Sequence, residues 1–236
     1  MKDSLGDRIK ENYENRTRYY LPRRTYSIIR IDGKSFHNYT KWFVKPFDDG
    51  LIDAMNESAI DLCKQIAGSQ FAFAQSDEIS VLMTDFDKAV TESWFDNNIQ
   101  KIVSVSSSIA TAKFNECIRS PKLALFDARV FVIPDPVEVE NYFIWRQNDW
   151  TRNSIQLVGR SAFSHKELQG KSNSEVQDML MLERGINWND YPTYLKRGRI
   201  IKKVRNEWEV DYEIPIFTQD RNYLGGLIPR HGYDLT

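Results

Sequence analysis

The chain has 236 residues, of which 41% are hydrophobic and 13% are aromatic. This length and apolar content suit one large domain, or a core domain with a substantial appendage, and exclude wholesale disorder. The formal net charge is −1, from 32 Lys and Arg against 33 Asp and Glu. The total charge therefore gives no indication of a nucleic-acid partner, and any basic surface must be local.

The first elements read as helix, strand and helix. Residues 1–24 are polar with mixed charge and are predicted to form an amphipathic helix that stops near Pro22, because proline cannot continue a helix interior. The β-rich run 25–32 ends at a glycine, which is typical of a strand followed by a turn. Apolar positions recur with the spacing of one helical face over 51–66, which predicts a helix there.

The next elements complete one sheet. Short strands are predicted over 71–74 and 79–83, and the link between them is short enough for a hairpin. A long helix is predicted over 88–119 and a further strand over 126–133. The β-α-β-β-α-β order is that of a ferredoxin-like split unit, whose right-handed crossovers place the first strand beside the hairpin in one antiparallel sheet. The predicted fold class is therefore α+β.

The last third has weaker patterns. A helix is predicted over 137–149, and Ser174–Gln177 has the form of a capping box that opens a short helix. The runs 199–204 and 208–217 alternate like the two strands of a hairpin. We expect this part to be a helical and β-hairpin appendage packed on the first unit. The predicted units are 1–135 and 136–236.

The cysteines and the apolar segments bear on the compartment. Cys63 and Cys117 lie in segments that read as helical, without CxxC spacing or a nearby histidine, which favours buried structural thiols over a disulfide framework or a zinc site. The stretch Met1–Ser4 opens a charged segment, and no window holds about 18 uninterrupted apolar residues. We therefore expect a cytoplasmic protein with no membrane partner.

Three carboxylates are predicted to meet at one edge of the sheet. Asp32 ends the first strand, and Asp77 and Glu78 lie in the hairpin turn, which the split topology places next to that end. Magnesium prefers oxygen ligands, and carboxylates on adjacent strands can hold two ions about 3.5–4 Å apart. Gly33 fits this hypothesis because a residue without Cβ lets the backbone approach a metal or a triphosphate closely.

Each neighbouring residue also has a structural interpretation. His37 could hydrogen-bond a loop backbone, and Phe36 follows a strand and is expected in the core. Backbone amides of Lys34 and Ser35 could cradle phosphate oxygens whatever their side chains are. Asp127 and Arg129 could form a structural ion pair on the last strand, and we expect Phe143 and Trp145 to pack the helix, with base stacking as the alternative.

Five segments occur in a characteristic order: Arg30–His37 (RIDGKSFH), Lys45-Pro46, Gln75–Glu78 (QSDE), Phe126–Val130 (FDARV) and Trp145–Asp149 (WRQND). Together they closely resemble the tRNA-histidine guanylyltransferase family, over roughly residues 25–150. That family comprises reverse, 3′-to-5′ polymerases with a polymerase-like palm. The resemblance implies that ATP or GTP activates a tRNA 5′ phosphate, which the 3′ hydroxyl of an incoming nucleotide then attacks.

The resemblance also implies roles for individual residues. Two Mg²⁺ ions would be held by Asp32, the Gly33 carbonyl and Asp77, with Glu78 behind them as a further catalytic carboxylate. The bound triphosphate would be wrapped by residues of two segments: Asp32, Gly33, Lys34, Ser35, Phe36, His37, Ser76 and Asp77. Lys45 and Lys101 stand where the family has basic residues near phosphates. A homotetramer is implied as well.

One stretch departs from the eukaryotic guanylyltransferases. Where those proteins resemble one another in a His-Ile-Asn-Asn run, this chain has Trp150–Ser154 (WTRNS), and the histidine is replaced. The difference favours the family's other branch, the guanylyltransferase-like proteins that repair truncated tRNA 5′ ends using a template base. We therefore expect template-dependent nucleotide addition, with guanosine addition specific to tRNA-histidine as the alternative.

A basic run offers an RNA contact, because phosphate binding needs a local positive field. Six cations fall within ten residues: Lys196, Arg197, Arg199, Lys202, Lys203 and Arg205. A solvated surface is the alternative, and the arginines between Arg16 and Arg24 are a weaker candidate for RNA contact.

Two other functions fit these residues less well than tRNA nucleotidyl transfer does. A nucleotidyl cyclase would need no RNA groove, and a non-catalytic RNA-binding module would be expected to lose Asp32 or Asp77.

Overall fold

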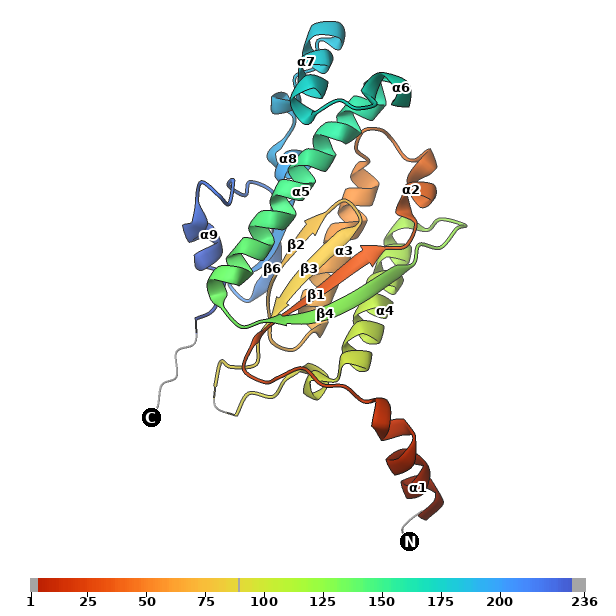
Figure 1. Ribbon diagram of the computed structural model, residues 1–236, viewed down its shortest axis with the longest axis vertical. Coiled ribbons are helices and arrows are strands. Elements are labelled where there is room, and N and C mark those ends of the chain that lie inside the picture. The colour runs from red at the N-terminus through yellow and green to blue at the C-terminus, as the bar shows by residue number, and fades with distance from the viewer. Residues whose placement is uncertain (1–3, 89, 231–236) are drawn as a thin grey trace.

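A six-stranded antiparallel sheet is the centre of the computed structural model, which describes residues 4–88 and 90–230 (Figure 1). Its strands are β1 (Tyr26–Gly33), β2 (Ser69–Gln75), β3 (Glu78–Met83), β4 (Phe126–Ile133), β5 (Arg199–Val204) and β6 (Glu207–Asp211). The strand order is β4-β1-β3-β2-β5-β6. The predicted position of the first strand beside the hairpin is confirmed, since β1 pairs with β3. The chain is thus a mixed α/β protein.

The helices lie on both faces of this sheet or beyond its ends (Figure 1). They are α1 (Ser4–Asn12), α2 (Phe36–Tyr39), α3 (Asp49–Gln65), α4 (Ile99–Ile118), α5 (Pro136–Ala162), α6 (His165–Leu168), α7 (Asn173–Arg184), α8 (Thr193–Arg197) and α9 (Arg221–Gly225). Short 3-10 turns are η1 (Glu14–Thr17), η2 (Thr40–Trp42), η3 (Trp94–Asn97) and η4 (Trp188–Asp190). Among the described residues, no helix is both long and apolar enough to cross a membrane.

The sheet separates two cores, because successive side chains of a strand point to opposite faces. Ile29 and Ile31 of β1 belong to the core beneath α3 and α4. Ile28 of the same strand packs with Phe143 of α5 in the second core. Arg30 and Asp32 follow Ile28 in steps of two, so β1 presents them on the face of the sheet on which α5 lies.

The C-terminal hairpin joins the same sheet. Ala74 of β2 is paired with Arg199 of β5, and β5 in turn pairs with β6. The predicted second strand, 208–217, is too long, because β6 ends at Asp211. There the Asp211 carboxylate accepts a hydrogen bond from the backbone N–H of Glu213, which turns the chain away from the ladder.

Two helices predicted in the first unit have different bounds in the structure. Within residues 4–24 the helical segments are α1 and η1, neither of which has a buried side chain, and Figure 1 shows α1 projecting from the body. The chain is extended after η1, because the backbones of Tyr19 and Leu21 bond to Ile99 and Asn97 and Leu21 packs against the first core. The helix predicted over 88–119 begins at Ile99, since Phe95 and Asp96 have positive φ and Asn98 caps α4. Residues 1–3 and 89, which fall in these predictions, lie outside the described residues.

The C-terminal helices differ in their bounds as well. The helix predicted over 137–149 is α5, which runs on to Ala162 because Ile155 and Val158 pack in a third core with α7. The capping box lies two residues earlier than predicted, with Ser172 as N-cap and Glu175 as its partner. Residues 231–236 of the predicted second unit lie outside the described residues.

Candidate active site

Asp32 and the β2–β3 turn meet at one edge of the sheet, as the sequence predicts. Asp32 is the register partner of Glu78, and the backbone N–H of Gly33 donates to the Asp77 carbonyl across 3.0 Å. The turn itself is tight, since Gln75 and Glu78 are paired and Ser76 has a φ of 44°. Two acidic side chains, Asp32 and Asp77, are therefore held next to each other by backbone pairing.

The environment of Asp77 disfavours its charged form. Burial, with smaller contributions from the nearby Asp32 and Glu78 carboxylates, raises the pKa of Asp77 to about 6, although a hydrogen bond from Ser76 acts in the opposite direction. The arginines at this edge pair with Glu78 and not with the two aspartates. A cation between Asp32 and Asp77 would relieve this electrostatic cost.

The loop after β1 is shaped by a glycine and an aromatic ring. A Cβ on Gly33 would overlap the ring of Phe36, which is buried against Phe114 and Phe126 at centroid distances of 5.5 and 4.9 Å. The core interpretation of Phe36 is thus confirmed. The amide of Lys34 donates to the Leu125 carbonyl at 2.8 Å, so that amide is not available to a phosphate.

Two hollows open on either side of the hairpin turn. One, the aromatic pocket, has a volume of about 280 Å³. Its lining includes His37, Phe43, Lys45, Phe47, Asp48, Ile52, Leu195 and Arg199. The other, the polar pocket, has about 350 Å³. Its lining includes Arg30, Asp32, Gln75, Arg146, Asp149, Asn153 and Arg160. Ser76, Asp77 and Trp150 line both, so the acidic turn faces a mainly apolar hollow and a mainly charged one.

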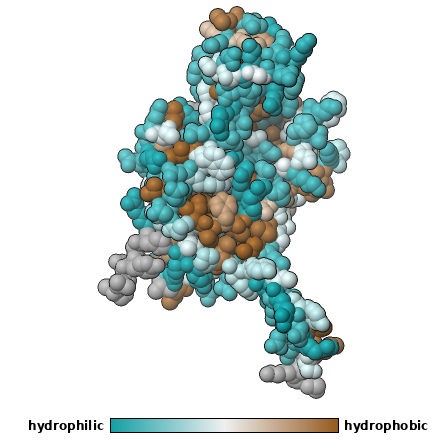
Figure 2. Space-filling model, viewed as in Figure 1, coloured by the Kyte–Doolittle hydropathy of each residue, from teal (hydrophilic) through white to brown (hydrophobic). Residues whose placement is uncertain are grey.

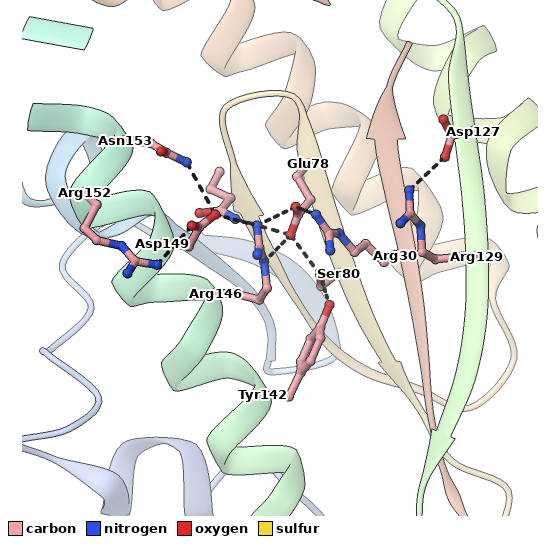
Figure 3. Close-up of polar contacts among 11 residues, drawn as sticks. Arg30, Glu78, Ser80, Asp127, Arg129, Tyr142, Arg146, Asp149, Arg152 and Asn153 are labelled. Carbon is pink, nitrogen blue, oxygen red and sulfur yellow. Dashed lines mark hydrogen bonds and ion pairs between the residues drawn. The ribbon is translucent and has the colours of Figure 1, made fainter. Parts of the chain in front are cut away.

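Glu78 is clamped by two arginines (Figure 3). Its carboxylate accepts bonds from Arg146 Nε at 2.7 Å and Arg146 Nη2 at 2.6 Å, and pairs with Arg30 Nη2 at 2.6 Å. Glu78 and Arg146 are each only 4% exposed. Both carboxylate oxygens of Glu78 have arginine partners. Glu78 therefore fixes the hairpin to α5 and is not free to bind a ligand in either pocket. The Trp145–Asp149 segment gave no sign of this, because the partners are 68 residues apart.

The basic residues named beside the phosphates lie in different places. Lys45 is exposed at the rim of the aromatic pocket, where its Nζ donates to the Thr40 carbonyl at 2.9 Å. Lys101 lies in the first turn of α4. The part of α4 that reaches the active edge is Thr111, whose hydroxyl accepts from the backbone N–H of Phe126, the partner of Gly33. Lys101 is roughly 15 Å earlier along that helix, so the fold does not bring it to this edge.

The predicted basic run is not one surface. Arg199 is only 1% exposed and donates to Asn56 at 2.6 Å, and burial lowers its pKa to about 10. Lys202 pairs with Asp211 at 2.5 Å. Lys203 stays exposed towards the end of β5 that points away from the hairpin turn. The strand pattern therefore divides the run between core, ion pair and solvent.

Two expectations about aromatic and charged residues have different outcomes. Phe143 is fully buried, which confirms its packing role. Trp145 packs against Tyr142 and Arg146 but is 49% exposed, so its packing role is confirmed only in part. Arg129 and Asp127 do form a pair on β4, at 3.5 Å, with both side chains more than half exposed.

Comparison with known proteins gives one consistent answer. The model of the tRNAHis guanylyltransferase family matches residues 6–134. A tRNA(His) guanylyltransferase of Debaryomyces hansenii is 31% identical, over 84% of this chain and 78% of that protein. Among solved structures, a bacterial tRNA(His) guanylyltransferase-like protein in complex with ATP is 50% identical, with a TM-score of 0.91 over 95% of this chain and 99% of that one. A bacterial protein of the same description in complex with GTP is 47% identical, with a TM-score of 0.85 over 96% and 99%.

Proposed function

The chain belongs to the tRNAHis guanylyltransferase family of tRNA nucleotidyltransferases, and from that premise we propose that it repairs truncated tRNA 5′ ends by template-dependent 3′-to-5′ nucleotide addition. The observation that carries the proposal is the pairing of Asp32 with the Asp77 turn between two pockets. The sheet edge then serves as a polymerase-like palm.

The donor set at this edge suits Mg²⁺. Among the described residues no group of three or more His, Cys, Asp or Glu could hold a metal ion, so the protein alone offers no closed cage. Asp32, the Gly33 carbonyl and Asp77 supply hard oxygens only, and magnesium usually takes one or two carboxylates together with substrate phosphates and water. When bound, two such ions would neutralise charge on the attacking and leaving oxygens.

The aromatic pocket supports a purine nucleotide as the activating substrate. The apolar wall of the pocket can take a base, and Asp77, His37 and Lys45 are polar residues of the same lining. The relatives solved with ATP and with GTP support either nucleotide here. The triphosphate then runs towards the Asp32–Asp77 edge, with the Ser35–His37 loop beside it.

In the proposed reaction, nucleotide transfer takes place in two displacements. An oxygen of the RNA 5′ phosphate attacks the α-phosphorus of ATP or GTP, and pyrophosphate leaves. The 3′ hydroxyl of the incoming nucleotide then attacks the activated 5′ phosphorus, its proton passes to solvent, and AMP or GMP leaves. The chain's own residues orient these groups: the Glu78 clamp fixes the hairpin, and the β1–β3 pairing fixes the distance between the two aspartates.

The choice of repair over guanosine addition rests on the stretch after Arg146. Trp150 is 4% exposed between the pockets, the Thr151 hydroxyl donates to the Lys196 carbonyl, and Arg152 pairs with Asp149. Trp150 and Thr151 are thus held against the protein, which supports selection of the nucleotide by base pairing across the RNA helix and not by these two residues. A homotetramer is part of the proposal, because one chain of this size is small for a whole tRNA.

The test is nucleotide addition to two tRNAs that lack their first nucleotide, tRNA-histidine and an unrelated one, with Mg²⁺ and single nucleotides. We expect both to be extended, and we expect the added nucleotide to follow the opposite base when that base is changed. Guanosine addition confined to tRNA-histidine, whatever base lies opposite, would instead support the activity in the name of the Debaryomyces relative. A cyclic product formed without RNA would support a cyclase.

A further inference from the structure

A half-exposed tryptophan stands over the arginine clamp. Trp145 of α5 is 49% exposed, although its ring lies 4.5 Å from the Arg146 guanidinium carbon and 5.9 Å from that of Arg30. Tyr142, one turn earlier, meets the ring edge-on at 5.8 Å. The indole is thus held by cation–π and aromatic contacts while half of its surface faces solvent.

The surface around Trp145 is open and partly apolar. In Figure 1, α5 runs diagonally along one side of the sheet, and no helix is drawn in front of β1 and β4. Figure 2 shows a hydrophobic patch on this side, low on the molecule between α5 and β4. Phe131 of β4 is only partly buried there and contacts the Tyr142 ring at 5.6 Å. No described helix or strand covers this patch.

The open surface leads directly to the catalytic carboxylates. Arg30 precedes Asp32 by two residues on the same face of β1, a spacing of about 7 Å along a strand. Trp145 lies over Arg30. If ions bound by Asp32 and Asp77 held the 5′ phosphate of the RNA, the terminal base would lie within reach of the indole.

Exposed cations flank the tryptophan. Arg129 on β4 and Arg152 on α5 have side chains 54% and 60% exposed, and Figure 3 shows them on either side of the clamp. Arg152 follows Trp145 by seven residues, two helical turns or about 10 Å along the same side of α5. Arg30 and Arg146 are turned towards Glu78 and are mostly buried, so Arg129 and Arg152 are the two arginines of this group that face solvent.

We propose that Trp145, Arg129 and Arg152 form the surface that receives the RNA end, with the terminal base pair stacked on the indole and backbone phosphates paired with the two exposed arginines. The proposal rests on the proposed function, because the RNA end must reach Asp32 and Asp77. An aromatic platform between cations is the surface on which nucleic-acid bases stack without sequence preference. That tolerance suits an enzyme that must accept ends of different sequence.

The test measures the affinity of a fluorescently labelled tRNA that lacks its first nucleotide. Trp145→Ala should weaken binding by about 5- to 150-fold, as loss of one base-stacking contact does. Trp145→Phe should stay within about threefold of wild type, whereas Trp145→Leu should resemble the alanine variant because it keeps apolar volume but no aromatic face. Affinity for a non-hydrolysable ATP analogue should not change in any of the three.

Further variants test the two arginines and the position of the tryptophan. Arg129→Ala and Arg152→Ala together should weaken tRNA binding and flatten its dependence on salt, since released counterions scale with neutralised phosphates. Trp42→Ala is the matched control, an indole 87% exposed on another part of the surface, and should leave tRNA affinity within about twofold. An equal loss from Trp42→Ala would remove the specific role of Trp145.

Three results would overturn the inference. If wild-type protein extends truncated tRNA and Trp145→Ala binds it with unchanged affinity, the stacking surface is wrong while the proposed function stands. If Trp145→Ala instead changes the mass measured by light scattering and not tRNA affinity, the surface joins copies of this chain. Wild-type protein that neither binds nor extends tRNA would overturn both proposals together.

Discussion

Replacing Asp77 with asparagine is expected to stop nucleotide transfer and yet to stabilise the protein in the absence of metal. Burial and the nearby carboxylates raise the pKa of Asp77 from 3.8 to about 6. Two pKa units correspond to about 3 kcal/mol at 1.36 kcal/mol per unit. Because the side chain is not fully buried, solvent reduces this to about 2 kcal/mol. For a chain of this size, 1 kcal/mol shifts Tm by about 2–4 °C, so Asp77→Asn should raise Tm by about 4–8 °C.

The pH dependence identifies the cause of that shift. An acid whose pKa is higher in the folded than in the unfolded state destabilises the fold where it is ionised, fully above about pH 6, and not at all below about pH 4. The Tm difference between Asp77→Asn and wild type in a chelating buffer should therefore shrink as pH falls from 8 to 4. Thermal denaturation across that range is the measurement, with the exposed Asp178→Asn as control.

Mg²⁺ and activity complete the test on Asp77. Added Mg²⁺ should raise the Tm of wild type by binding the folded state and should raise that of Asp77→Asn less. Nucleotide addition by the variant should fall by at least on the order of 10³-fold, since bound metal ions lower the barrier by several kcal/mol. The reasoning would be refuted if Asp77→Asn were less stable than wild type at pH 8, or if the Tm difference between them did not change with pH.

Two further substitutions test how the edge is built. Gly33→Ala should lower the unfolding free energy by about 1–3 kcal/mol in chemical denaturation, because its Cβ would overlap the Phe36 ring, whereas Gly50→Ala, with only Asp48 Oδ1 nearby at 3.3 Å, should not. Arg146→Met should cost about 3 kcal/mol by leaving a buried carboxylate short of a partner, and adding Glu78→Gln should restore part of it. A change below about 0.5 kcal/mol in either case would contradict these packing and charge arguments.

Local patterns and topology were enough to place the two aspartates. The alternation in β1 puts Ile29 and Ile31 on one face and Ile28 on the other, which fixes the face of Asp32. The hairpin follows from a short polar link between two apolar runs. Both are properties of neighbouring residues, so a single sequence contains them.

Contacts across the fold were not predictable in the same way. The length of α5 beyond residue 149 depends on packing against α7, and the Glu78 clamp joins residues 68 positions apart. The run of cations could not be divided into buried Arg199 and paired Lys202 without knowing which strands flank β5. The resemblance supplied the residue type for Lys101 but no position in space, and the fold places it away from the edge.

Helix α5 connects stability with substrate access at this edge. Its inner side carries Arg146 and Trp150, four residues apart, which hold the hairpin and line the polar pocket. Its outer side carries Trp145 and Arg152, which stay exposed. The clamp places two guanidiniums on Glu78, and Asp149 also pairs with Arg146, so these four side chains together carry no net charge. The β1–β3 pairing and this clamp therefore hold Asp32 and Asp77 side by side from the inner side of α5, while the outer side of the same helix stays exposed and, in the proposed function, receives the RNA end.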